Sequence, residues 1–153
     1  MPAGHPAYQQ AVDLRYKIFF EPTGTSIDHL FDAQEGASEH VVALGPGDEL
    51  AGYARFCDLG AGEGQISQLV VAPAWRGDLR VAHGLYDRVL GRAASNCLER
   101  LVADVRLPGV RAFQRYGFRP CGEPFPSPKT GILHQRMVFR LNGTGLLRIW
   151  WLP

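Results

Sequence analysis

Apolar side chains recur at helical spacing in three parts of the chain. In residues 7–20 they lie three or four positions apart until Pro22 and Gly24 end the pattern. Residues 110–116 form a short apolar segment that stops at a glycine. Residues 78–97 carry a longer apolar face opposite a charged one, made by Ala82, Leu85, Tyr86, Val89, Leu90, Ala93 and Cys97. The pattern predicts three helices, the longest of which buries one face.

Short runs rich in β-branched and aromatic residues lie between these helices, separated by turns rich in glycine and proline. They predict strands over residues 40–44, 50–58, 65–71, 101–107, 118–122 and 135–141. The turn at 45–48 joins the first two strands as a hairpin, while residues 23–38 and 123–129 predict loops. Because residues 69–71 are continuously apolar, we expect the third strand to be buried on both faces. The order of elements predicts one α+β domain, with a mixed, mostly antiparallel sheet and helices on both faces.

The composition fits one globular domain over residues 1–153, with a core at about 8–141 and an apolar tail at 142–153. The net charge of +1 favours neither nucleic acid nor an anionic membrane as a partner, so an anionic ligand needs a local site. No apolar run approaches the roughly 20 residues of a membrane span, and the N-terminus has no secretory pattern. Three cysteines without metal-ligand spacing predict buried, reduced thiols, a cytoplasmic location and no metal site.

The chemistry is concentrated where a strand turns into the long helix, at residues 71–82. The first turn of a helix has backbone N–H groups without internal partners and a partial positive charge. The turn before it carries Arg76 and Gly77. This arrangement is typical of a site for a phosphate or pyrophosphate group.

Several segments, in this order, resemble the GNAT superfamily of acyl-coenzyme A-dependent N-acyltransferases. Residues 66–77 resemble its core motif, a strand followed by Val-x-Pro, an aromatic residue and Arg-Gly before a long helix. Residues 113–118 resemble its second motif, a short helix that ends in Gly-Phe. Weaker likenesses lie at residues 14–22, 39–43, 51–55 and 131–137, so the resemblance covers roughly residues 8–141.

The resemblance implies an acyl-CoA donor, an amine acceptor, and direct attack of the amine on the thioester carbonyl. It implies two parallel strands that splay apart, with the pantetheine arm along the first of them at Leu69, Val70 and Val71. Phe113 would lie beside the donor. The pyrophosphate would be held at Arg76 and by backbone N–H groups of Gly77, Asp78, Leu79, Arg80, Val81 and Ala82.

The pyrophosphate loop departs from the family pattern because Leu79 and Val81 stand where glycines are usual. Glycine lets the backbone approach the phosphates closely, which a side chain can hinder. Ala82 is a candidate for the small residue if the loop is shifted by one, and Arg76 and Arg80 can supply charge instead. Relatives that take long acyl chains, or acyl carriers other than CoA, also depart from the glycine pattern, so the resemblance leaves the transferred group open.

The catalytic acid and base also depart from the pattern. Phe113 replaces the usual proton-donating tyrosine, and Tyr116 is the nearest phenol. No carboxylate occupies the central strand where a base is common, which leaves Gln65 and Ser67 there and Glu63 just outside. Histidines titrate near neutrality, so His134 and His40 are alternatives. Arg55 and Glu21 are candidates for selecting a carboxylate or an amine on the acceptor.

Three hypotheses about function follow. The first is an N-acyltransferase acting on a small amine, an amino acid or a peptide. The second is a fatty-acyl transferase that uses acyl-CoA or an acyl-carrier protein to make a signalling lipid or lipopeptide. The third is a catalytically degenerate GNAT domain that serves as a binding module. The apolar tail adds the possibility of a lid, an extra strand or a contact with a second subunit, so a homodimer is a further hypothesis.

Overall fold

A single sheet organises the chain, whose computed structural model describes residues 4–141. The strands are β1 (Glu39–Leu44), β2 (Leu50–Gly60), β3 (Glu63–Val71), β4 (Arg100–Arg106), β5 (Arg119–Pro120), β6 (Phe125–Pro126) and β7 (Leu133–Arg140). Their order is β1-β2-β3-β4-β7-β5, with β6 also paired to β7. Only β3 and β4 are parallel, and the other neighbours are antiparallel, as the sequence predicts.

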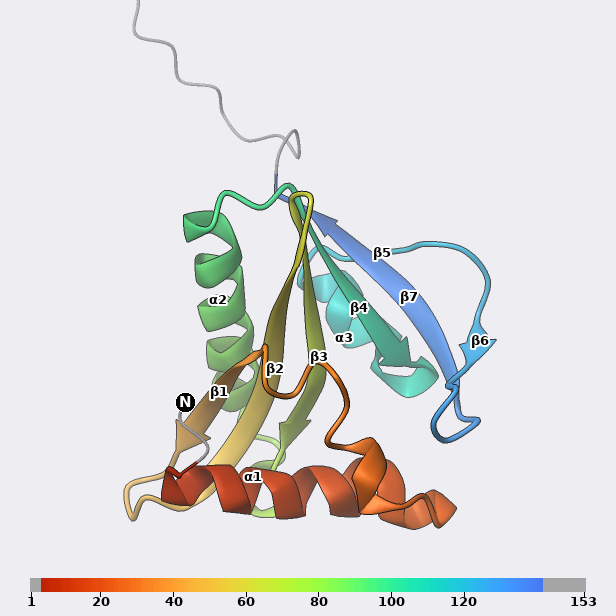
Figure 1. Cartoon of the computed structure of the whole chain (residues 1–153). Coiled ribbons are helices and arrows are strands. Elements are labelled where there is room, and N and C mark those ends of the chain that lie inside the picture. Colours follow the sequence, from red (N-terminus) through yellow and green to blue (C-terminus); the bar gives the residue numbers. More distant parts are fainter. Residues whose placement is uncertain (1–3, 142–153) are drawn as a thin grey trace, which may run out of the picture.

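Helices cover both faces of this sheet (Figure 1). The helix α1 (Pro6–Arg15) continues as a π-helical turn at Tyr16–Phe20 and packs on one face. The helices α2 (Leu79–Ser95) and α3 (Val110–Arg115) pack on the other. Short 3-10 turns lie at Glu21–Thr23, Ile27–His29, Pro73–Trp75 and Leu107–Gly109. The predicted α+β domain with two covered faces is confirmed.

The side chains of β2 show why both faces need a helix. Successive side chains of a strand point to opposite sides of a sheet. Tyr53 therefore packs against the α1 side, while its neighbour Ala54 and then Phe56 join the core beneath α2. All three are almost fully buried. The same division continues in β3, where Val70 faces α1 and Ile66 faces α2.

The long helix is shorter than predicted, and this changes the environment of a cysteine. Asp78 is the N-cap residue, and the helix ends at Ser95. Cys97 follows with a left-handed backbone (φ 57°), and the N–H of Leu98 bonds back to the carbonyl of Ala93. This is the usual way in which a chain reverses after a helix, and it buries Leu98 instead of Cys97. The predicted place of Cys97 on the buried face is therefore wrong.

The prediction of buried thiols holds only for Cys57, since Cys97 and Cys121 are both exposed. Smaller differences occur at the ends of elements. The first helix loses its α-helical hydrogen bonding after Arg15, the strand predicted at 118–122 shrinks to β5, and the predicted loop at 123–129 contains β6. Among residues 4–141, no helix is both long and apolar enough to cross a membrane. The predicted apolar tail at 142–153 lies outside the described residues.

Candidate functional site

The parallel strands β3 and β4 separate part-way along their length (Figure 1). Their pairing runs from Glu63 opposite Arg100 to Gln65 opposite Val102 and ends there, although β3 continues to Val71. A cavity of about 630 Å³ lies beyond this point. Its walls come from both strands, the π-helical turn at Tyr16–Phe20, the loop at residues 32–34, α3 and the loop before β7. The splayed pair implied by the resemblance is therefore present, and the space between the strands is open.

A bulge in β3 lies in the wall of this cavity. Tyr53 pairs with Val70 and Arg55 pairs with Ser67, so the single residue between them on β2 faces two residues of β3. One of these two is Gln68, which has a left-handed backbone (φ 54°). Such a conformation is costly for a residue with a side chain and persists only where the surroundings hold it. It turns the backbone of β3 beyond the point where its pairing with β4 ends.

A buried arginine holds the bulge in place. The Nη1 of Arg15 donates a hydrogen bond to the side-chain oxygen of Gln68 at 2.9 Å. Arg15 has no exposed surface, and its guanidinium stacks over Tyr53 at 4.3 Å. It is also paired through two hydrogen bonds, at 3.0 and 2.9 Å, with the carboxylate of Glu35. The left-handed turn at Gln68 is thus tied to a charge network under α1.

Glu35 is the centre of that network. Its two oxygens also accept hydrogen bonds from Tyr8 at 2.7 Å and from Arg55 at 3.0 Å. Burial by itself raises the pKa of a carboxyl group, but the hydrogen bonds from Arg15 and Tyr8 outweigh it and lower the pKa of Glu35 to about 2. The carboxylate is therefore charged throughout the neutral range.

Asp32 extends the network into the cavity wall. It accepts two hydrogen bonds from Arg55, at 3.0 and 3.1 Å, and one from the ammonium group of Lys129 at 2.6 Å. Burial opposes ionisation, yet the bonds from Arg55 and Lys129 lower the pKa of Asp32 to about 2. The Nε of Arg55 also donates to the hydroxyl of Ser67 at 3.1 Å. Arg55 is thus committed to two carboxylates and to β3, so it is not free to bind an acceptor's carboxylate by itself.

The predicted catalytic residues divide into two groups. Gln65, Ser67 and His134 line the cavity. Glu63 lies at the closed end of the strand pair, where it forms an ion pair with Arg100. Tyr116 stacks on Tyr86 in the core beneath α2, with ring centres 4.2 Å apart. Neither Glu63 nor Tyr116 lines the cavity, whereas Phe113 does.

The two histidines differ in what their ring nitrogens do. In His134 the Nδ1 lies 2.8 Å from the carbonyl of Ile132, which can only accept, so Nδ1 carries the hydrogen and Nε2 keeps its lone pair. In His40 the same logic assigns the hydrogen to Nε2, which donates to the carbonyl of Glu35, while Nδ1 accepts from Tyr53. Burial lowers the pKa of His40. His134 is the histidine that lines the cavity.

The predicted pyrophosphate turn closes partly on itself. Gly77 adopts a left-handed backbone (φ 96°). Asp78 then caps the helix by accepting a hydrogen bond from the N–H of Arg80 at 3.1 Å, and it also pairs with that residue's guanidinium. The N–H groups of Asp78 and Val81 bond to the carbonyls of Trp75 and Asp78. Three of the N–H groups predicted to hold the pyrophosphate therefore have partners, and a carboxylate lies beside them.

The missing glycines of this turn have a structural explanation at one position. Val81 is buried and lies over Gly52 of β2, where an added Cβ would come within 2.7 Å of its Cγ1. A large residue at 81 therefore fills space that a glycine at 52 leaves open. The side chain of Leu79 is 82% exposed, Arg76 is exposed, and Ala82 is half-buried.

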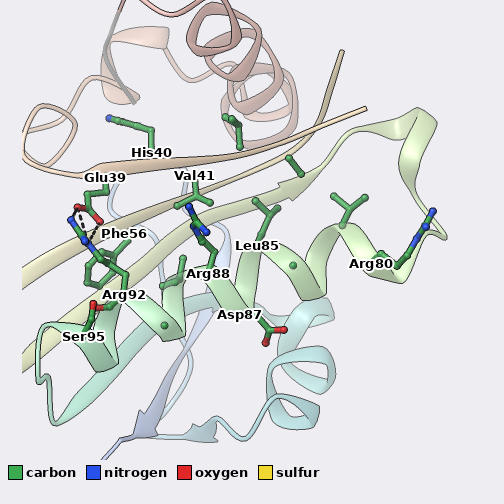
Figure 2. Close-up of a pocket in the computed structure, with 16 residues that line it drawn as sticks. Glu39, His40, Val41, Phe56, Arg80, Leu85, Asp87, Arg88, Arg92 and Ser95 are labelled. Atoms are coloured by element: carbon green, nitrogen blue, oxygen red, sulfur yellow. Dashed lines mark hydrogen bonds and ion pairs between the residues drawn. The ribbon is translucent and has the colours of Figure 1, made fainter. Parts of the chain in front are cut away.

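A second, more open hollow of about 970 Å³ lies between β1 and α2 (Figure 2). The ion pair between Glu39 and Arg92 lies at one end of it, and Arg88 projects into it from α2. Of the predicted site residues that the structure describes, His40, Arg80 and Val81 line it. The smaller cavity between β3 and β4 therefore gathers the predicted chemistry. Within residues 4–141, no three histidine, cysteine, aspartate or glutamate side chains are grouped as metal ligands.

A family model described as "Acetyltransferase (GNAT) domain" matches residues 23–141. The chain belongs to the GNAT family. As a member it is an acyl-CoA N-acyltransferase.

Solved structures show the same fold. Escherichia coli ElaA is 21% identical with a TM-score of 0.73, and the match covers 89% of this chain and 92% of that one. An acyl-CoA N-acyltransferase from Pseudomonas aeruginosa is 21% identical with a TM-score of 0.68, covering 90% and 94%. A GNAT acetyltransferase from Elizabethkingia anophelis, with acetyl-CoA bound, is 19% identical with a TM-score of 0.71, covering 92% and 95%. A search of the curated proteins found no match.

Sequence reasoning missed several residues of this GNAT site. Arg15 is four positions after Ala11 on the apolar face of the first helix, and a charge at such a position is a signal that was available. Asp32, Glu35 and Lys129 lie in predicted loops, where no periodicity distinguishes them from other polar residues. Only the folded chain brings them together, across as many as 97 positions between Asp32 and Lys129.

Proposed function

We propose that this GNAT protein moves an acyl group from acyl-coenzyme A to the amine of a small molecule, an amino acid or a peptide. The observation that carries the proposal is the separation of β3 from β4 beyond Gln65. Residues 66–71 of β3 have no partner strand on that edge among the described strands. Their backbone groups are therefore available to pair with the amide groups of a pantetheine arm.

The donor site proposed here follows from this edge. Leu69, Val70 and Val71 pair with the arm through their backbone, and Phe113 contacts it from α3. The pyrophosphate lies at the start of α2, beside Arg76 and the N–H groups of the turn at 77–82. Binding there requires the guanidinium of Arg80 to leave Asp78 and turn toward the phosphates, which is easy because that pair is exposed. The acetyl-CoA bound to the Elizabethkingia protein supports a CoA thioester as donor.

The reaction proposed is a direct transfer. The amine nitrogen attacks the thioester carbonyl carbon, the carbon–sulfur bond breaks, and the thiolate leaves as CoA. The proton lost from the nitrogen goes to Nε2 of His134, whose lone pair is free because Nδ1–H is bonded to Ile132. The turned backbone at Gln68 supplies an N–H toward the carbonyl oxygen, where negative charge develops. Gln65 and Ser67 line the same wall and orient the acceptor.

A longer acyl chain than acetyl is a second candidate for the transferred group. The cavity has aromatic and aliphatic walls at Phe19, Phe20, Phe113 and Phe125, with Leu69 between the strands. Apolar surface of this extent stabilises an alkyl chain, by about 0.8 kcal/mol for each buried methylene group. It favours a medium or long acyl donor over acetyl-CoA, in agreement with the missing loop glycines.

The test is a thiol-release assay over a series of acyl-CoA chain lengths and amines, with thermal stabilisation by each acyl-CoA measured alongside. We expect stabilisation by at least one acyl-CoA and amine-dependent release of thiol. His134→Gln should lower kcat, because the proton acceptor is lost. Tyr116→Phe serves as the matched control and should leave kcat unchanged, since the phenol stacks in the core.

Two outcomes would contradict the proposal. If no acyl-CoA stabilises the protein, the domain is a degenerate binding module. If acyl-carrier protein supports turnover and CoA thioesters do not, the proposed acyl-CoA donor is wrong, although acyl transfer to an amine still takes place.

A further inference from the structure

The half of the cavity that faces α1 carries more positive than negative charge. Four cations line it or are hydrogen-bonded to lining groups, namely Arg15, Arg55, Arg106 and Lys129. Two carboxylates face them, those of Glu35 and Asp32. Two positive charges are left uncompensated. The carboxylate of Asp104, which lines the cavity as Asp32 does, changes nothing because it is paired with Arg136.

Arg106 is the cation in this group without a carboxylate partner. It ends β4, and its guanidinium donates hydrogen bonds to the carbonyls of Ile18 at 3.3 Å and Phe19 at 3.1 Å. These bonds place it on the α1 side of the cavity and over the ring of Phe19, 5.0 Å from its centre. Among residues 4–141, no carboxylate oxygen comes within ion-pair distance of it. Each Nη atom keeps a second N–H that these two bonds do not use.

We propose that the acceptor carries a carboxylate as well as the amine, and that Arg106 binds this carboxylate with help from Lys129. The inference rests on the proposed acyl transfer and adds the class of acceptor. A guanidinium matches a carboxylate through two parallel hydrogen bonds, which a partly buried site strengthens. Lys129 lines the same wall, and its ammonium group gives one hydrogen bond to Asp32, so it has further N–H groups to offer.

The same charges disfavour polycationic acceptors. A polyamine or an aminoglycoside needs unpaired carboxylates to replace its hydration. Both carboxylates in the cavity wall, Asp32 and Asp104, are already paired with cations of the chain. A second cation entering this half of the cavity would meet Arg106 and Lys129. The acceptor is therefore an amino acid or a short peptide with a free carboxylate, of a size that fits beside the donor's acyl group.

The experiment compares amino acids with their carboxamides, because the two differ only in the charge that Arg106 is proposed to bind. The probes are glycine, leucine and phenylalanine, the carboxamide of each, O-phosphoethanolamine and spermidine. We expect kcat/KM for the best acid to exceed that of its carboxamide at least tenfold, which corresponds to about 1.4 kcal/mol. The amine of an amino-acid carboxamide loses its proton more easily than the amine of the free acid. Deprotonation of the amine therefore favours the carboxamide and cannot explain a preference for the acid.

Variants then assign the preference to Arg106. Arg106→Gln should reduce the ratio between acid and carboxamide toward one, and Arg106→Lys should retain part of it. Arg88→Gln is the matched control, since Arg88 is exposed on α2 and lines the other hollow. It removes the same charge and should leave the ratio unchanged. A lower melting temperature of Arg106→Gln with an unchanged ratio would show that Arg106 only holds the π-helical turn at Tyr16–Phe20 to β4, and would overturn the inference.

A binding measurement keeps this test independent of turnover. Thermal stabilisation by each probe is measured with CoA present, and the acids should stabilise the protein where their carboxamides do not. Equal or better binding of the carboxamides or spermidine would overturn the inference while leaving acyl transfer intact. Preferred binding of O-phosphoethanolamine would mean that the anion is a phosphate and would also overturn it. Failure of CoA itself to bind would count against the proposed function.

Discussion

Replacing Glu35 by glutamine should destabilise the protein strongly at neutral pH. The carboxylate of Glu35 is almost fully buried and is the one carboxylate paired with Arg15, which has no exposed surface. Glutamine has nearly the same shape but no charge. The variant therefore leaves a buried guanidinium without a counter-ion, and such a change is among the most costly in a protein interior.

The magnitude follows from the pKa of Glu35, which folding lowers from 4.5 to about 2. A difference of one pKa unit corresponds to about 1.36 kcal/mol, so the charge contributes about 3 kcal/mol to the free energy of unfolding at neutral pH. Because the folded pKa is the lower one, this contribution is complete above about pH 4.5 and is lost as the pH falls toward about 2. Near pH 3 roughly half of this contribution should be left.

Urea denaturation of the wild type and Glu35→Gln, at pH 7 and near pH 3, measures this directly. We expect the gap between their free energies of unfolding to shrink from about 3 kcal/mol to roughly half of that on acidification. Glu63→Gln is the matched control, since its ion pair with Arg100 is partly exposed and should be worth less than about 1 kcal/mol. A gap below about 1 kcal/mol at pH 7, or one that does not shrink near pH 3, would refute the assignment.

Three further predictions concern other parts of the site and its support. Gly52→Ala should lower the free energy of unfolding by about 1–3 kcal/mol in denaturation, because the new Cβ meets Val81. The control Gly84→Ala, on the exposed side of α2, should raise it by up to about 1 kcal/mol. Asp78→Asn keeps the helix cap but removes a negative charge at the proposed pyrophosphate turn, so the Kd for CoA should fall several-fold at low salt. The control Asp87→Asn, further along α2, should leave the Kd for CoA unchanged. Gln68→Gly keeps the left-handed bulge but loses the hydrogen bond from Arg15. We expect a large fall in kcat, with only small changes in KM and in stability.

The amino-acid sequence by itself determined the elements and their order. Helical and alternating periodicities are local properties, and they placed the long helix and five strands to within a few residues. The motif at residues 66–77 likewise indicated the strand, turn and helix at the donor end, because its residues are consecutive. Local patterns failed where the chain leaves an element. The reversal at Cys97 exposes a thiol that helical spacing predicted to be buried.

Only the tertiary structure decided which charges meet at the wall of the cavity between β3 and β4. Arg15, Asp32, Glu35, Arg55 and Lys129 come from a helix, a strand and two loops, and their pairing depends on how α1 and the loop before β7 pack against the sheet. The same packing leaves Arg106 without a carboxylate and places His134, rather than Tyr116, at the cavity. Charge interactions depend on distance and burial, which no spacing along the chain specifies. For that reason the sequence indicated an acyl-CoA fold, while the charges on which the proposed acceptor class rests became visible only in three dimensions.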